Sequence, residues 1–386
     1  MLDPAEAFII DAVAHPYNHS PDNYLEPSTA SVICDLAYGF NVTCPDPAYA
    51  VPRESYISDW SMEDTAKVLF AESPNDMAVV HTLPFGWFKD KYCSVEKSAE
   101  AVRRWPHRFR AYASVDPLMG DAALEDLDRQ VELLKPSGLK IYPVSWNDGV
   151  LRRWRMDDPK VAFPLYERAM EHGIKVIAVH KAVPVGPVVT GDAFDVNDVE
   201  GAAGAFPDLS FEIVHGGLAF TEETAWLLAR FPNVYVNMEV LNYVLERRPR
   251  TFSKMLLEFL SVAGPPAYDR LIWASGCVVS HPRPSIEALC RYEIPEDLLE
   301  GAGMFIPVPQ ITDEHKRNIL AGNWARIHGL DLGAARNAIS EANDEFSAAY
   351  AKDPQPTPWS TTSKWDQIEE ERGRLGAMQP AHAPAA

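Results

Sequence analysis

The sequence lacks the features that membrane and nucleic-acid proteins need. No apolar run in its 386 residues reaches the roughly 18 residues that a membrane-spanning helix requires. Lys and Arg together number only 35 against 55 Asp and Glu, which gives a formal net charge of −20. An acidic chain repels phosphate backbones and anionic lipid surfaces. We therefore expect neither a nucleic-acid nor a membrane partner.

Cysteine is also scarce. The five cysteines are scattered, odd in number and form no C-x-x-C pair. The acidic N-terminus carries no signal-peptide pattern, so reduced thiols and a cytoplasmic location are expected. G-x-S-x-G, P-loop, H-E-x-x-H and EF-hand patterns are absent, and no G-x-G-x-x-G follows a strand. These absences exclude the common serine-hydrolase, NTPase and dinucleotide-binding signatures.

The sequence does contain a repeated alternation of apolar, β-branched runs with helical patterns. Each run is typical of a parallel strand that is buried on both faces. The eight runs are Phe8–His15, Met77–Leu83, Phe109–Val115, Gly138–Tyr142, Ile174–His180, Leu209–His215, Asn233–Val240 and Arg270–Gly276. Eight such repeats predict an α/β fold, a (β/α)8 TIM barrel, rather than an open doubly wound sheet.

Two segments depart from this repeat within a predicted barrel of residues 1–331. Residues 16–73, rich in Pro, Tyr and Asp, are expected to form an inserted, partly helical cap over the barrel mouth. A C-terminal helix is expected over 332–351. The Pro- and Ala-rich tail 352–386 is either disordered or docks Trp359 and Trp365 onto another subunit. A homodimer is the default oligomer.

Chemistry-bearing residues gather at the predicted strand ends, where a barrel builds its active site. They are Asp11, His15, His81, Asp116, Lys140, His180, His215, Glu239, Ser275, Gly276 and Cys277. Imidazole is the commonest metal ligand and a natural base near neutral pH. Three histidines at corresponding ends therefore indicate a site, although a lone strand-end histidine is more often structural. His81 is interpreted as a wall residue, His281 as loop structure and Cys277 as a buried inert thiol.

The sequence resembles the amidohydrolase-related family, in the branch of aminocarboxymuconate-semialdehyde decarboxylase and its hydrolase relatives. The resemblance covers roughly residues 8–330. The matching motifs are IIDAVAHPYN (9–18), GLKIYP (138–143), VIAVH (176–180), FEIVHGG (211–217), RLIWASGCVVSHP (270–282) and ITDEHKRNILAGNWARIHGLD (311–331). It also resembles bacterial amidohydrolase-like proteins that accompany diiron hydrocarbon monooxygenases.

Two positions of the family's site pattern are lost. The first-strand H-x-H pair reads Val13-Ala14-His15, and the strand-eight aspartate aligns with Gly276. His180 and His215 match the strand-five ligand and the strand-six base or ligand. Val13 and Gly276 have no lone pair to offer a metal. Even the loss of a residue that only hydrogen-bonds to a metal ligand lowers metal affinity or activity roughly 10–100-fold.

Three functional hypotheses follow from this altered pattern. In the first, His15, His180 and the carboxylate of Glu239, or of Asp116, hold a divalent metal such as Zn, Mn or Fe. In the second, the site is metal-free, Lys140 stabilises an oxyanion and His215 is the general acid or base. Either makes the chain a hydrolase or C–C lyase for a small organic acid, amide or lactone. In the third, catalysis is lost and the barrel is an accessory partner of a diiron hydrocarbon monooxygenase.

Overall fold

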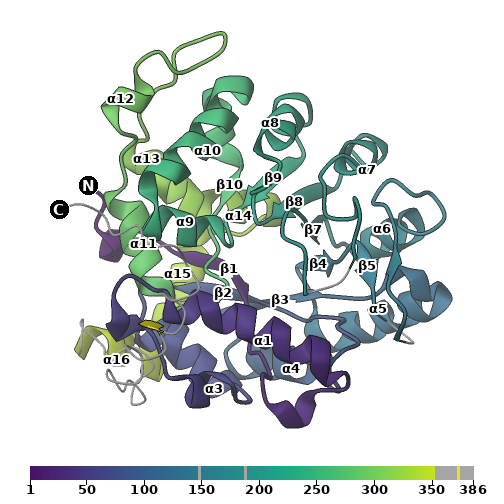
Figure 1. Cartoon of the computed structure of the whole chain (residues 1–386). Coiled ribbons are helices and arrows are strands. Elements are labelled where there is room, and N and C mark those ends of the chain that lie inside the picture. Colours follow the sequence, from purple (N-terminus) through teal and green to yellow (C-terminus); the bar gives the residue numbers. More distant parts are fainter. Residues whose placement is uncertain (147–148, 187–188, 353–371, 374–386) are drawn as a thin grey trace.

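The computed structural model describes residues 1–146, 149–186, 189–352 and 372–373; Trp359, Trp365 and nearly all of the tail lie outside this part. Eight parallel strands form one sheet, in the order β1-β2-β3-β4-β7-β8-β9-β10, with helices around it (Figure 1). The strands are β1 (Ile10–Ala14), β2 (Met77–His81), β3 (Phe109–Ala113), β4 (Gly138–Ile141), β7 (Val176–His180), β8 (Ser210–Val214), β9 (Val234–Asn237) and β10 (Leu271–Ile272). A separate two-stranded hairpin joins β5 (Val144–Ser145) to β6 (Arg152–Arg153).

The barrel closes between its last and first strands. Beyond Ile272 the chain continues beside β1, where the Ala12 amide donates to the Trp273 carbonyl at 3.1 Å. Further along, the Gly276 amide donates to the Val13 carbonyl at 3.1 Å. These bonds satisfy backbone groups that an open edge would leave unpaired. The prediction of a (β/α)8 TIM barrel is confirmed.

Besides short 3₁₀ and π-helical segments, the described residues form sixteen α-helices. They are α1 (Pro27–Val42), α2 (Arg53–Tyr56), α3 (Met62–Ala66), α4 (Val95–Arg104), α5 (Asp121–Leu134), α6 (Phe163–Glu171), α7 (Val199–Ala205), α8 (Thr221–Arg230), α9 (Leu241–Arg247), α10 (Pro249–Ala263), α11 (Pro282–Arg291), α12 (Glu296–Leu299), α13 (Asp313–Arg317), α14 (Asn323–His328), α15 (Leu332–Ala342) and α16 (Glu345–Lys352). Thr312 caps α13 with its side chain. The region 332–352 forms two helices, because the chain turns at Asn343 in a left-handed conformation.

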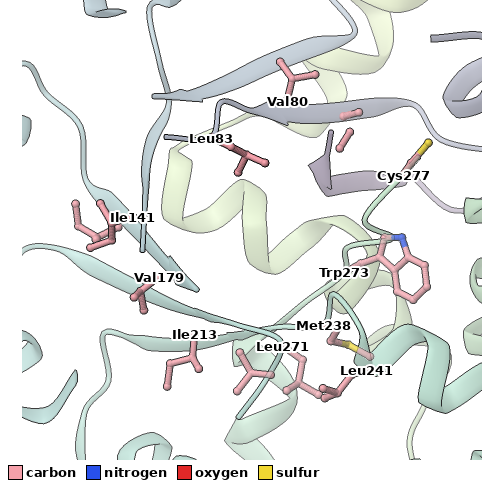
Figure 2. Packing of buried hydrophobic residues seen from close by; sticks show 14 of the residues in the cluster. Val80, Leu83, Ile141, Val179, Ile213, Met238, Leu241, Leu271, Trp273 and Cys277 are labelled. Atoms are coloured by element: carbon pink, nitrogen blue, oxygen red, sulfur yellow. The ribbon is translucent and has the colours of Figure 1, made fainter. Parts of the chain in front are cut away.

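Buried apolar residues fall into two layers that alternate along the strands. Val80, Val179 and Ile213 belong to the larger layer, which also contains apolar residues of the surrounding helices (Figure 2). Their chain neighbours Ala178 and Val214 belong to the smaller layer, together with residues of α14 and α15. Since successive strand residues point to opposite faces, the smaller layer fills the barrel interior.

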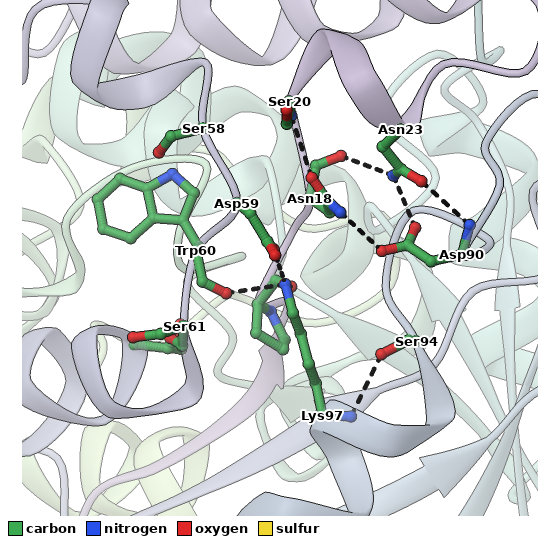
Figure 3. Close-up of polar contacts among 12 residues, drawn as sticks. Asn18, Ser20, Asn23, Ser58, Asp59, Trp60, Ser61, Asp90, Ser94 and Lys97 are labelled. Carbon is green, nitrogen blue, oxygen red and sulfur yellow. Dashed lines mark hydrogen bonds and ion pairs between the residues drawn. The ribbon is translucent and has the colours of Figure 1, made fainter.

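The segment between β1 and β2 contains α1, α2 and α3 and is tied to the barrel by polar contacts (Figure 3). The amide groups of Asn18 and Asn23 donate to the two carboxylate oxygens of Asp90 at 2.8 Å and 2.6 Å. The Lys97 ammonium, on α4, donates to the Trp60 carbonyl at 2.8 Å and pairs with Asp59. This segment is therefore fixed against the loop after β2 and against α4.

Helix α16 is held to the barrel by a buried ion pair, which gives a stability prediction. Arg108 donates to both carboxylate oxygens of Asp344, at 2.6 Å and 2.9 Å. We expect Asp344→Ala to lower the free energy of unfolding by about 3 kcal/mol or more, because it leaves the Arg108 charge buried and unpaired. Denaturant unfolding measures this. Asp297→Ala is the control, since its pair with Arg250 is exposed and such pairs contribute at most about 1 kcal/mol.

The same ion pair predicts a pH dependence. Burial alone would raise the pKa of Asp344, but the hydrogen bonds and charge of Arg108 outweigh it and lower the pKa to about 2. A carboxyl group with a lowered pKa stabilises the fold above its ordinary value of about 4 and loses that contribution as the pH falls to about 2. Wild type and Asp344→Ala should therefore converge in stability at acid pH, and equal stabilities at pH 7 would contradict the assignment.

Candidate active site

A cavity of about 260 Å³ opens at the carboxyl ends of the strands, where it meets the segment after β1. Its polar wall includes His15, His180, His215 and Glu239, so the structure brings these four predicted residues together. Its apolar wall comes largely from α1, through Ile33, Leu36, Ala37 and Phe40. This spacing places the four side chains on one helix face. A concave, mainly apolar cavity with a few converging polar groups is the usual form of a small-molecule site.

His180 and His215 form a hydrogen-bonded pair. The His180 Nε2 lies 2.7 Å from the Val183 carbonyl oxygen, which can only accept, so this nitrogen carries the proton. The Nδ1 of a neutral His180 is then an acceptor, and His215 Nε2 donates to it at 2.9 Å. The remaining lone pair of the dyad is on His215 Nδ1. That atom has no hydrogen-bond partner in the described residues and lies 3.7 Å from a carboxylate oxygen of Glu239.

Burial keeps all three cavity histidines neutral. Desolvation lowers the pKa of both His180 and His215 well below the ordinary value. The charge of His215 adds to this effect at His180, and the charge of Lys140 adds to it at His215. Burial and the charge of Lys140 lower the pKa of His15 to about 3. His15 Nδ1 lies 3.4 Å from the His81 carbonyl oxygen, which leaves Nε2 as its acceptor. Neutral imidazoles with a free nitrogen are suited to accept a proton.

Backbone strain concentrates beside this dyad. His215, Val240 and Ala182 follow three neighbouring strands and all have positive φ, at 70°, 68° and 66°. A left-handed conformation is uncommon for residues with a Cβ atom and is a clear outlier for a β-branched residue such as Val240. Such strain persists where the surrounding structure imposes it, and it clusters at functional sites. The strained backbone therefore supports the placement of the active site here.

Lys140 and Glu239 are two buried groups whose charges influence each other. Both side chains are buried, and the Lys140 ammonium has no hydrogen-bond partner among the described residues. It lies 5.3 Å from the centroid of the Tyr142 ring. Burial lowers the pKa of Lys140 to about 8, against the opposing charge of Glu239. Burial likewise raises the pKa of Glu239 to about 7. Such opposed shifts are typical of residues with acid and base roles.

The residues present do not fit a bound divalent metal. In the part of the chain that the structure describes, no group of three or more His, Cys, Asp or Glu side chains is placed to hold a metal ion. Both ring nitrogens of His180 already have hydrogen-bond partners. Val13 is buried without a donor atom. The ligand set of His15, His180 and Glu239 therefore stays a prediction.

Gly276 is required by the close approach of its neighbours. A Cβ atom there would lie 2.8 Å from Glu239 Oε1 and 3.0 Å from the Tyr243 hydroxyl, and the residue has a φ of 70°. A side chain at position 276 would therefore require the ends of the Glu239 and Tyr243 side chains to move, in a backbone conformation that favours glycine.

The other strand-end candidates lie apart from the cavity floor. Asp116 caps the turn Pro117–Met119 and lines a separate cavity of about 440 Å³. Asp11 accepts hydrogen bonds from Ser275. Cys277 is buried, and burial raises the pKa of its thiol well above the ordinary value. His81 is buried with Nε2 2.8 Å from the Ala12 carbonyl oxygen, and His281 caps α11.

Comparison with known proteins defines the family. A family model described as Amidohydrolase matches residues 10–330, so the chain belongs to the amidohydrolase family. No curated protein matches the sequence. Among solved structures, an uncharacterized TIM-barrel protein from Bordetella bronchiseptica has a TM-score of 0.58 at 16% identity, covering 85% of this chain and 99% of its own. These similarities confirm the fold.

Two further solved structures carry named activities. A 4-oxalomesaconate hydratase from Rhodopseudomonas palustris has a TM-score of 0.51 at 16% identity, covering 87% of this chain and 100% of its own. A 5-carboxyvanillate decarboxylase from Novosphingobium aromaticivorans, solved with bound manganese, has a TM-score of 0.50 at 12% identity, covering 84% of this chain and 98% of its own.

Within the described ranges, no helix has the length and apolar character needed to cross a membrane.

Sequence reasoning missed the aromatic residues of the site. Tyr17, Tyr92, Tyr142, Tyr243 and Phe85 all line the cavity. Tyr17 and Tyr142 follow predicted strand-end residues by two positions each, and this proximity was the one available signal. The contacts themselves depend on how the cap and the loops fold back.

Proposed function

We propose that the protein is a hydrolase of the amidohydrolase family that opens a small lactone or amide with a mainly apolar body. The observation that carries this proposal is the hydrogen-bonded His180–His215 pair, whose single free lone pair faces Glu239 across 3.7 Å. The cavity volume of about 260 Å³ suits a molecule of about one ring. The apolar face of α1 suits a substrate with little charge outside its reacting group.

The proposed chemistry uses the chain's own groups. His215 Nδ1 takes a proton from a water molecule, and the resulting hydroxide adds to the substrate's carbonyl carbon. The charge of Lys140 favours the oxyanion that develops. Glu239 is neutral in part of the population near neutral pH, since its pKa is raised to about 7. It gives its proton to the leaving oxygen or nitrogen as the carbon–heteroatom bond breaks. Transfer from His215 to the Glu239 carboxylate then restores both groups.

The same acid–base pair suits C–C cleavage of a small organic acid, which the decarboxylase among the similar structures performs on its own substrate. A divalent metal, a homodimer and a cytoplasmic location remain predictions for this chain. Elemental analysis of the purified protein tests the metal. Near-stoichiometric Zn, Mn or Fe that is lost in His180→Ala would replace the metal-free scheme with a metal-dependent one.

Activity is tested with the purified full chain and a panel of small lactones, aryl amides and aromatic carboxylic acids. We expect ring opening or amide cleavage that disappears in a His215 variant and persists in His172→Asn, whose histidine lies on the surface beside Asp128. No turnover of any lactone or amide would overturn the hydrolase proposal. Turnover of the acids alone would assign C–C cleavage. Co-purification with a monooxygenase subunit without any turnover would favour the accessory role.

A further inference from the structure

Two tyrosine hydroxyls in the cavity have no assigned role. In the described residues, neither the Tyr17 nor the Tyr142 hydroxyl has a hydrogen-bond partner, although both residues are largely buried and line the cavity. The other two cavity tyrosines differ. The Tyr92 hydroxyl is bonded to His19 Nδ1 at 3.0 Å, and the Tyr243 hydroxyl donates to the Ser275 carbonyl at 2.6 Å. Neither of the two unpartnered hydroxyls is sealed off from the cavity, so a ligand or water bound there can supply the missing partner.

The rings of these two tyrosines are held in place by the site histidines. The Tyr17 ring lies 4.9 Å from the His15 ring, and the Tyr142 ring stacks on His180 at 4.6 Å with an interplanar angle of 28°. Tyr17 and Tyr142 belong to one continuous set of ring contacts that runs through Tyr92 and Phe85, at 4.4, 5.9 and 4.8 Å. Fixed rings hold their hydroxyl groups in fixed directions, which is the condition for preorganised donors.

We propose that Tyr17 and Tyr142 together donate hydrogen bonds to one substrate oxygen, the carbonyl oxygen that becomes the oxyanion. The catalytic role of this donor pair rests on the proposed function, whereas its binding of an anionic oxygen is independent of that function. Burial, and then the charge of Glu239, raises the pKa of both phenols well above the ordinary value. Both phenols are therefore protonated hydrogen-bond donors at neutral pH.

The proposed donor pair also defines the ligand class. Its ligand has a flat or compact apolar body, which contacts α1 and the aromatic rings, and one carbonyl or anionic oxygen directed at the two hydroxyls. The unpartnered Lys140 ammonium, near the face of the Tyr142 ring, adds a positive charge on the same side. Lys140 then acts by charge, and the two tyrosines supply directed hydrogen bonds.

The test uses 4-nitrophenol as the probe, because its ring suits the apolar wall and its ionised oxygen mimics an oxyanion. Binding is followed by calorimetry and by the visible absorption of the phenolate. We expect the wild type to bind the phenolate, and Tyr17→Phe and Tyr142→Phe each to weaken binding about tenfold or more, which is the size of a lost hydrogen bond to a charged group. Tyr166→Phe is the control, because the Tyr166 hydroxyl donates to the Met156 carbonyl at 3.3 Å and does not line the cavity, and we expect less than a twofold change.

Kinetics separates a donor role from a structural one. With an active substrate, each Phe variant should lower kcat about 10²-fold with a smaller change in KM, because an oxyanion donor acts in the transition state. The proposal falls if the wild type does not bind the phenolate, if neither Tyr17→Phe nor Tyr142→Phe weakens binding, or if Tyr166→Phe weakens it equally. Phenolate binding that needs both hydroxyls, without any turnover, would retain the donor pair and reject hydrolysis. Turnover that needs His215 but neither hydroxyl would retain the hydrolase proposal and reject the donor pair.

Discussion

His215→Asn is expected to lower kcat by about 10²- to 10⁴-fold while the protein stays folded. The range is the usual contribution of a general base. The asparagine amide has no lone pair that accepts a proton near neutral pH, so the basic nitrogen that faces Glu239, His215 Nδ1, would be lost. The donor to His180 Nδ1 would also be lost or displaced.

Asparagine is chosen because of the backbone at this position. His215 has a φ of 70°, and asparagine adopts the left-handed region more readily than most other residues. The thermal midpoint of His215→Asn should therefore change little, and a large fall in kcat would report chemistry rather than unfolding. Steady-state kinetics and a thermal melt measure the two effects. Retention of more than a third of the wild-type kcat would mean that His215 is not the base.

Lys140→Met is expected to stabilise the protein, by on the order of 2–3 kcal/mol, and to abolish activity. The wild-type ammonium is buried without a hydrogen-bond partner among the described residues, and a desolvated charge is unfavourable. Methionine has a similar shape and no charge. Equilibrium unfolding in denaturant measures the change. A site residue that lowers stability is the expected signature of a role in function.

Lys181→Met is the matched control because Lys181 is equally buried but well paired. Its ammonium lies 2.7 Å from Asp198 and donates to the Ala193 carbonyl at 2.8 Å. Removing it leaves the buried Asp198 carboxylate without its cation, so this variant should lose about 3–5 kcal/mol of stability. The two substitutions are chemically identical, and opposite signs would identify the local partners as the cause. A lower thermal midpoint in Lys140→Met would contradict the prediction.

The Lys140 effect should also depend on pH. Burial lowers the pKa of Lys140 to about 8 in the folded protein, against about 10.4 in an unfolded chain. The cost of the buried charge is complete below about pH 8 and declines as the pH rises towards 10.4, where the unfolded chain also loses its proton. The stability difference between wild type and Lys140→Met should therefore shrink over this interval.

Much of the fold was predictable because the strands are short, apolar and β-branched. All eight predicted runs contain a strand of the barrel. Their ends were less predictable. The run at 270–276 contains only the two-residue β10, because residues beyond Ile272 close the barrel through single bonds to β1 rather than through a regular ladder. The single helix predicted over 332–351 forms two helices, α15 and α16.

The site was predictable in its histidines but not in its chemistry. Strand-end position brought His15, His180, His215 and Glu239 into one cavity, as the barrel geometry requires. The sequence could not show that His180 uses both nitrogens in protein contacts, since Val183 lies in a loop. It also could not show that Asp116 turns away to cap a 3₁₀ turn. Contacts between loops depend on tertiary packing, which local patterns do not encode.

The close approach of Glu239 to Gly276 limits which residues position 276 can accept without rearrangement of the cavity. An aspartate at 276 and a glutamate held as Glu239 is here would compete for the same volume, since even a methyl group at 276 would approach Glu239 Oε1 to 2.8 Å. An aspartate at 276 would therefore require the ends of the Glu239 and Tyr243 side chains to move, and it would have to adopt the left-handed backbone conformation of this position.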